Sequence, residues 1–113
     1  MRKSRESASD LLGKARMLGS AELADVCLGM VIRRRRLAAG ISMEALGETM
    51  GVSYQQVQKY ETGTNRVAFS RLLPLAAALN CSASELVTDV ENELHVYDQR
   101  KNGLSDPSRE AGR

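Results

Sequence analysis

Aromatic residues are scarce in this chain, whose 113 residues include no tryptophan, one phenylalanine and three tyrosines. The interior is therefore predicted to be aliphatic, and the prevalence of alanine, leucine and methionine among the apolar residues favours helices. A hydrophobic content of 42% and a charged content of 27% are ordinary for a folded protein. At this length the chain is predicted to form one small domain with a single modest core.

Long apolar runs and paired cysteines are also missing. No segment approaches the length of a membrane span and no signal-peptide pattern opens the chain, so we expect a cytoplasmic protein without a membrane association. Cys27 and Cys81 do not make a disulfide framework, and we expect both to be small buried apolar residues.

Catalytic and metal-binding motifs are absent from the sequence. The only histidine, His95, is expected at the surface, and no CxxC or Cys/His spacing indicates zinc. No glycine-rich phosphate loop or nucleophile motif occurs. The sequence therefore predicts a protein that is not an enzyme and that needs no cofactor or metal.

Charge is unevenly distributed along the chain. Residues 1–42 carry nine basic and four acidic side chains, residues 43–80 carry three of each, and residues 81–113 carry four basic and seven acidic side chains. A basic front half followed by an acidic tail suits a nucleic-acid binder whose far side faces away from phosphate.

The most informative stretch is Ser42 to Gly63, which contains two short helical patterns joined by a tight turn. Ser42 and Ser53 are predicted N-caps, and Gln56 would complete a capping box with Ser53. Gly51 supplies a left-handed residue for the turn. These signals predict helices over 43–50 and 54–62.

Helices are also expected on both sides of this unit. One begins at Ala21 or Val26, capped by Ser20 or Asp25, and ends at Ala39. Another begins at Ser70, with Pro74 inside the tolerated first turn, and a last one follows the capping box of Ser82 and Glu85. Further expectations concern the ends: mobile residues 1–8, a short helix between Ser9 and Gly19, a helix or a strand over 94–97, and a disordered tail over 101–113.

The predicted helix 54–62 has distinct inner and outer faces. Val57 and Tyr60 are its apolar residues, so their side packs on the core, and Glu61 is drawn toward the same side. A buried carboxylate requires a cation nearby. Arg36 lies four residues after Ile32 on the buried side of the preceding long helix, so we predict an Arg36–Glu61 ion pair.

The outer face then presents Tyr54, Gln55, Gln58, Lys59 and Thr62. Glutamine can bond an adenine edge in bidentate fashion, and lysine can donate to the acceptors of guanine. The alternative is an ordinary solvated helix face, on which glutamine and lysine are common. The tight turn, the two caps and the basic loop that follows favour instead a helix that reads DNA bases.

These residues make the chain resemble the Cro/CI-type (XRE) helix-turn-helix family, the lambda-repressor-like fold of five helices. The matching segments are Arg36-Leu-Ala-Ala-Gly40-Ile-Ser42, Leu46-Gly-Glu-Thr-Met-Gly51-Val-Ser, Gln56-Val-Gln-Lys-Tyr-Glu61-Thr-Gly63 and Leu72-Leu-Pro-Leu-Ala76-Ala-Ala-Leu79, followed by Glu85-Leu86. Together they cover about residues 26–88.

The resemblance implies an all-α, five-helix DNA-binding domain with short N-terminal and C-terminal extensions. It implies that helix 43–50 crosses the DNA backbone and that helix 54–62 enters the major groove. The implied base-reading residues are Tyr54, Gln55, Gln58 and Lys59. The implied DNA-backbone residues are Ser42, Met43, Ser53, Gln56, Thr64, Asn65 and Arg66.

Three positions need separate treatment. The family often has glutamine where this chain has Met43, so the backbone N–H groups at that helix start are expected to meet phosphate alone. Gly47 replaces the usual alanine, at a cost of up to about 1 kcal/mol in helix propensity, and would let the two helices pack closer. Among Arg33 to Arg35, Arg33 is the best candidate for DNA, and a solvated cluster at the helix end is the alternative.

The sequence thus predicts a sequence-specific regulator of transcription, a repressor, that binds double-stranded DNA as a homodimer on a near-palindromic operator. The predicted organisation is an extension over 1–22, a DNA-binding domain over 23–90 with its helix-turn-helix unit at 43–62, and a polar tail over 91–113 that is expected to contribute to dimerisation and then to become disordered. The alternative is an antitoxin or similar regulator of the same fold that uses residues 90–113 to bind a protein partner.

Overall fold

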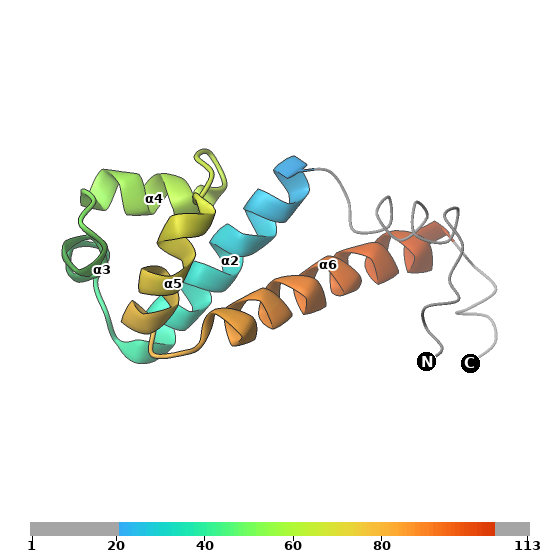
Figure 1. Ribbon diagram of the computed structural model, residues 1–113. Coiled ribbons are helices and arrows are strands. Elements are labelled where there is room, and N and C mark those ends of the chain that lie inside the picture. The colour runs from blue at the N-terminus through green and yellow to red at the C-terminus, as the bar shows by residue number, and fades with distance from the viewer. Residues whose placement is uncertain (1–20, 106–113) are drawn as a thin grey trace.

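A computed structural model describes residues 21–105, with side chains over 22–100, and shows an all-α fold (Figure 1). The described residues form five helices and no strand, so the predicted fold class is confirmed. The helices are α2 (Ala21–Ala39), α3 (Met43–Met50), α4 (Tyr54–Thr62), α5 (Phe69–Ala78) and α6 (Ala83–Ser105). The expectations for residues 1–8, for the short helix before Gly19, for a cap at Ser20 and for residues 106–113 lie outside the described residues.

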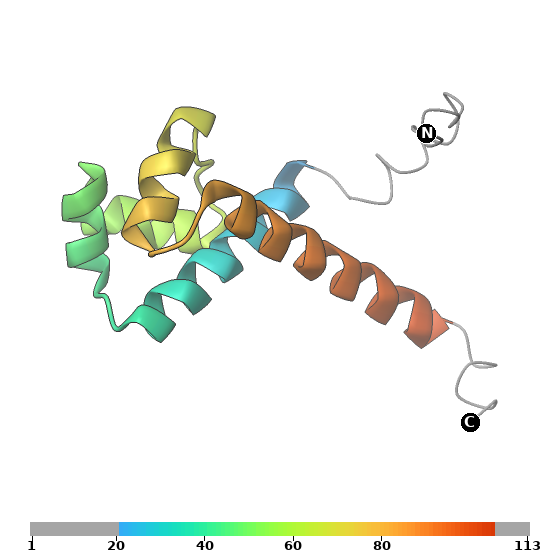
Figure 2. The same cartoon turned by 60° about the horizontal axis from the view of Figure 1, so that its bottom comes forward.

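Four of the helices gather around one core, and α6 reaches beyond it. Figure 1 shows α3 and α4 at one end, α5 beneath α4, and α2 crossing the bundle. Figures 1 and 2 both show the C-terminal half of α6 projecting away from the other described helices. Of the helices described, none is both long and apolar enough to cross a bilayer.

The core is aliphatic, as the scarcity of aromatic residues predicts. Every described helix contributes to it, and the largest fully buried side chains are Val31, Ile32, Leu46, Val57, Leu75 and Leu86. Tyr60, which is 4% exposed, is the aromatic member. Burying each such side chain contributes roughly 1.5–3 kcal/mol, so this cluster fixes how the five helices pack together.

The turn between α3 and α4 follows the chemistry expected from its sequence. Gly51 adopts φ 76°, a left-handed conformation that favours glycine, and its N–H donates to the Glu48 carbonyl at the end of α3. The Val52 N–H donates to the Gly47 carbonyl at 2.9 Å. The chain therefore turns sharply within three residues, which fixes the angle at which α4 leaves α3.

Two expectations about helix starts are wrong. Of the two expected starts of the long helix, Ala21 is confirmed and Val26 is wrong, so Asp25 lies inside α2 and does not cap it. Helix α5 begins at Phe69, one residue earlier than expected, so Pro74 is its sixth residue and lies beyond the first turn. Proline there removes the N–H that would bond the Ser70 carbonyl. Ser70 and Pro74 are both exposed, so water can satisfy that carbonyl.

Helix α6 continues where the sequence pattern weakens. The capping box is complete, because Ser82 Oγ accepts from the Glu85 N–H at 3.1 Å and Glu85 Oε1 accepts from the Ser82 N–H at 2.9 Å. Residues 94–97 lie within this helix, so the alternative of a short strand there is wrong. The helix runs through the expected domain limit at residue 90 and through residues 101–105, so the prediction of disorder there is wrong.

Candidate nucleic-acid interface

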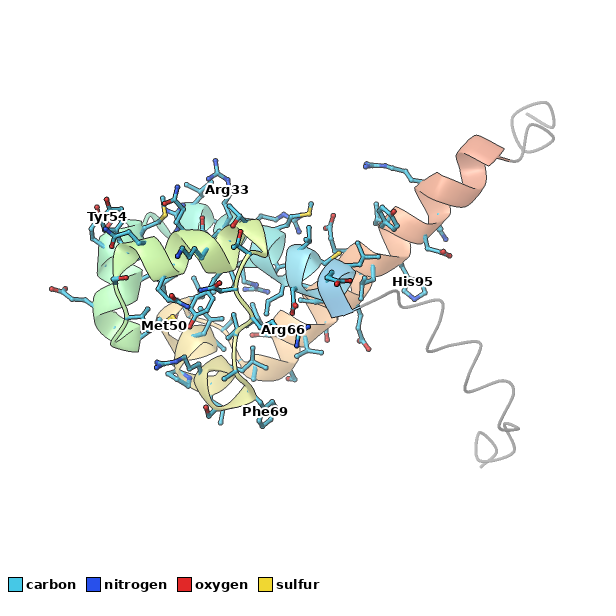
Figure 3. The ribbon with its side chains drawn as sticks, turned by 90° about the horizontal axis from the view of Figure 1, so that it is seen from above. Arg33, Met50, Tyr54, Arg66, Phe69 and His95 are labelled. Atoms are coloured by element: carbon cyan, nitrogen blue, oxygen red, sulfur yellow. The ribbon has the colours of Figure 1, made fainter. Side chains whose placement is uncertain are left out.

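Helix α4 separates an anchored face from an exposed polar face. Val57 is completely buried and Tyr60 nearly so, whereas the four predicted base-reading residues are all exposed. Those residues are Tyr54, Gln55, Gln58 and Lys59. Figure 3 looks onto α4 from outside the bundle and shows Tyr54 at one end of the molecule, with Arg33 beside the helix. The structure thus brings the predicted base-reading side chains together on one accessible surface.

The N-caps of α3 and α4 are formed by the predicted serines. Ser42 Oγ accepts from the Ala45 N–H at 3.0 Å, and Ser53 Oγ accepts from the Gln56 N–H at 3.1 Å. Each hydroxyl satisfies one of the free donors in a first turn. The Met43 side chain packs against the core, so only the backbone at the start of α3 is placed to meet an anion.

A buried ion pair joins α2 to α4. Arg36 Nε lies 2.5 Å from Glu61 Oε2, and Arg36 Nη2 donates to Glu61 Oε1 at 3.1 Å. The two side chains are 7% and 5% exposed. Arg36 Nη1 also donates to the Ile41 carbonyl at 2.9 Å. The hydrogen bond to Glu61 raises the pKa of Arg36, so the guanidinium stays charged at every working pH.

The other three arginines of this run divide between α6 and solvent. Arg34 pairs with Glu93 at 2.9 Å, and Arg35 pairs with Asp89 at 2.6 Å. The hydrogen bond to Asp89 raises the pKa of Arg35. Arg33 is exposed and has no ion pair within residues 22–100. Arg34 and Arg35 therefore face α6 rather than DNA, with Arg34 still solvated at 57% exposed, and Arg33 remains the candidate for DNA.

The loop after α4 is fastened to that helix by Asn65. Its N–H donates to the Lys59 carbonyl at 3.1 Å, and its Nδ2 donates to Gln56 Oε1 at 3.2 Å. The second bond corrects the predicted capping box: Gln56 supplies its backbone N–H to Ser53, but its side chain turns to Asn65 instead. Asn65 is half-buried, so it positions the loop as well as lying near the expected phosphate contacts.

Two further loop residues carry accessible polar groups. Thr64 Oγ1 lies 2.8 Å from Thr62 Oγ1, which extends the polar end of α4. Arg66 Nε lies 3.2 Å from Asp25 Oδ2, but the Arg66 side chain is 73% exposed. Figure 3 shows Arg66 on the other side of α4 from Arg33. A cation therefore flanks the exposed helix on each side.

Two structural residues near the site were not predicted from the sequence. A Cβ on Gly29 of α2 would lie 2.5 Å from the carbonyl oxygens of Tyr60 and Glu61, so only glycine permits this helix crossing. A glycine inside a helical pattern is a signal of such contacts. Arg71 Nη1 donates to the Met50 carbonyl at 3.2 Å and ties α5 to the end of α3.

Gly47 permits a close approach, but to the turn before α4 and not to that helix itself. A Cβ there would lie 2.5 Å from the Val52 carbonyl oxygen, so the missing side chain lets α3 and the turn approach closely. The lower helix propensity of glycine is the cost of that contact.

The remaining reactive groups lie away from this surface. Cys27 is buried and Cys81 is half-buried, and burial raises the pKa of both thiols. His95 is exposed on α6, far from α4 in Figure 3. Within the described residues, no group of three or more histidine, cysteine or acidic side chains could hold a metal.

The comparison with known proteins agrees with the helix-turn-helix geometry of α3 and α4. A helix-turn-helix family model matches residues 32–86. An uncharacterized transcriptional regulator in the ATPase CF(0) region of Rhodospirillum rubrum is 40% identical over 80 residues, which cover 71% of this chain and 70% of that protein. The chain belongs to the Cro/CI-type helix-turn-helix family.

Other family members and solved structures agree. An HTH-type transcriptional regulator of Sinorhizobium medicae is 45% identical over 69 residues, which cover 61% of this chain and 50% of that protein. The match thus spans about half the length of that relative. The restriction-modification controller protein C.AhdI of Aeromonas hydrophila has a TM-score of 0.53 and 34% identity, covering 59% of this chain and 98% of that one.

The clp gene regulator ClgR of Corynebacterium glutamicum has the same fold. Its TM-score is 0.68 at 20% identity, over 74% of this chain and 87% of that one. At that identity the likeness supports the arrangement of helices and not the individual residues of the site.

Proposed function

We propose that this chain is a sequence-specific DNA-binding regulator of transcription that reads the major groove with α4. The observation that carries the proposal is the two-sided construction of α4. Its inner side is fixed by Val57, Tyr60 and the buried Arg36–Glu61 pair, and its outer side is exposed and polar. A helix held this rigidly can enter a groove without losing much conformational freedom on binding.

The outer face has the chemistry needed to distinguish base pairs. Tyr54 and Gln55 lie in the first turn, the part of a recognition helix that contacts base edges. Gln55 and Gln58 carry both a donor and an acceptor, as the adenine edge requires, and Lys59 suits the two acceptors of guanine. We therefore assign base reading to these four side chains.

Groups around α4 are placed for the DNA backbone. The N-termini of α3 and α4, at Ser42-Met43 and Ser53, offer backbone donors to phosphate. The remaining proposed backbone contacts come from Gln56, Thr64, Asn65, Arg66 and Arg33. Because the Gln56 side-chain oxygen accepts from Asn65, its NH₂ group remains for DNA, and an N–H donor suits a phosphate oxygen.

We further propose that the chain acts in the cytoplasm as a homodimeric repressor on a near-palindromic operator. Dimers with this motif place their recognition helices about 34 Å apart, one turn of DNA. Related proteins that are named transcriptional regulators support the regulatory role. We assign DNA binding to residues 23–90 and place the rest of α6 outside the DNA contact.

Selection of binding sites from random duplex DNA tests the proposal. The full chain should enrich two inverted half-sites whose centres lie about 10 base pairs apart. The matched control is the variant Gln55→Ala/Lys59→Ala, which changes exposed residues only and should fold but enrich no site. Failure of the unaltered chain to enrich any sequence would refute base reading and favour the role of a partner-binding regulator.

A further inference from the structure

The only phenylalanine of the chain lies on the surface. Phe69, the first residue of α5, is 80% exposed, and Leu73, one turn later, is 62% exposed. They are the two most exposed large apolar side chains among the described residues, and Pro74 and Ala77 continue the exposed strip. Single exposed apolar residues are ordinary, but large ones on successive turns of one helix mark a contact surface. We call Phe69, Leu73, Pro74 and Ala77 the α5 face.

The α5 face is uncharged. The one charged residue of α5 is Arg71, and its Nη1 donates to the Met50 carbonyl at 3.2 Å and so does not join this face. DNA phosphate or a strongly charged partner would find no complementary group here. A second copy of the same face meets no like-charge repulsion, so the chemistry favours self-association.

The position of this face allows a dimer that leaves α4 free. Figure 3 looks onto α4 and shows Phe69 at one edge of the molecule, with Arg33 at the opposite edge. A second copy can be placed against the Phe69 edge by a two-fold rotation about an axis parallel to the viewing direction of Figure 3. Its α4 then faces the viewer, as α4 of the first copy does. Both recognition helices would then face the same side, as one duplex requires.

We infer that the α5 face is the isologous interface through which two copies of this chain form the DNA-binding dimer. This inference rests on the proposed function, because it names the contact that the proposed homodimer uses. An interface of standard size covers about 800 Å² of each partner around a buried apolar centre. The α5 face supplies that centre, and exposed residues of the adjoining loops, such as Ala68 and Asn80, supply the rim.

A competing surface lies on the projecting part of α6. Val96 and Tyr97 are 43% and 47% exposed, less than Phe69 or Leu73. Exposed charged side chains such as Arg100 share that helix, so a contact there has a less apolar centre. Val96 therefore serves as a variant that separates the two surfaces.

The test measures self-association of the full chain by sedimentation equilibrium. Phe69→Ser/Leu73→Ser should raise the dimer dissociation constant at least about ten-fold, as expected when central apolar contacts are lost. Leu37→Ser is the matched control, because Leu37 is 55% exposed on α2, and it should leave the constant unchanged. Circular dichroism verifies that the variants fold.

A covalent test supplements this measurement. In a Cys81→Ser background, Leu73→Cys should form a disulfide-linked dimer on mild oxidation, whereas Leu37→Cys should not. An unchanged dissociation constant for the double serine variant would overturn the inference, and so would a wild-type chain that stays monomeric. Loss of the dimer in Val96→Ser alone would assign the interface to α6 and overturn it as well.

Measurements of DNA binding distinguish a failure of this inference from a failure of the proposed function. The double serine variant should retain the wild-type affinity for a duplex containing one half-site and lose the extra affinity for two. If the wild-type chain dimerises through α5 but no duplex is enriched in selection, the interface stands and the proposed function fails. If the variant binds two half-sites as tightly as wild type, the interface fails and the proposed function stands.

Discussion

Arg36 Nε and Glu61 Oε2 lie 2.5 Å apart in the interior, although their residues are separated by 25 positions in sequence. The pair joins the C-terminal part of α2 to the C-terminal part of α4, and its bond to the Ile41 carbonyl adds the loop that leads into α3. One guanidinium therefore connects all three elements that determine how α4 is presented.

Glu61→Ala should destabilise the protein by roughly 3–5 kcal/mol, because it leaves the Arg36 charge buried without its partner. Urea unfolding measures the change. Glu93→Ala is the control, because it breaks an ion pair in which Arg34 is 57% exposed, and such surface pairs contribute only about 0–1 kcal/mol. Equal losses in the two variants would show that the inner pair is solvated. Arg36→Met/Glu61→Leu should recover most of the lost stability, since it removes both charges.

Lys59→Ala should relax the preference for one base pair of the operator, at a cost of about 1–3 kcal/mol on the preferred sequence and little on others. The side chain is exposed on the outer face of α4, so folding should be unaffected. Affinities for a set of single-base operator variants provide the measurement. A uniform loss over all sequences would move Lys59 from base reading to backbone contact.

Arg66→Ala should weaken binding to every sequence alike and lower the slope of log affinity against log salt by about one unit. Asp25→Asn makes an informative companion, because Asp25 Oδ2 lies 3.2 Å from Arg66 Nε and competes with phosphate for this cation. That substitution should strengthen binding at low salt. An unaltered salt slope in Arg66→Ala would place this side chain off the DNA.

Asn65→Ala should reduce operator affinity by releasing the loop that carries Thr64 and Arg66. A lost hydrogen bond of this kind costs about 0.5–1.5 kcal/mol. A double-mutant cycle with Gln56→Ala separates positioning from direct contact: if Asn65 acts through Gln56, the second substitution adds little. Additive losses would indicate that each side chain binds DNA independently.

Gly29→Ala should destabilise the fold by about 1–3 kcal/mol, even though alanine favours helices. The new Cβ would lie 2.5 Å from two backbone carbonyl oxygens of α4, neither of which can move without shifting that helix. Thermal unfolding measures the effect, with Ala38→Ser, an exposed change in the same helix, as a near-neutral control. A stabilised Gly29→Ala protein would disprove the close crossing.

The sequence alone determined the local elements of the site. Serine caps, Gly51 and the spacing of apolar residues specify where α3 and α4 begin and end, because these signals act within a few residues. The inner face of α4 follows from Val57 and Tyr60 alone. The Arg36–Glu61 pair also follows, because a carboxylate on a buried face requires a cation on the facing helix.

Only the tertiary structure decided which partners the polar residues take across the bundle. Gln56 could bond back to Ser53 or forward to Asn65, and the path of the loop selects Asn65. Asp25 could have capped α2 but lies opposite Arg66 instead. Helix α6 continues past residue 90 where its own pattern weakens, while Arg34 and Arg35 on α2 bind its acidic residues. Such choices depend on contacts between residues distant in sequence, which no local pattern encodes.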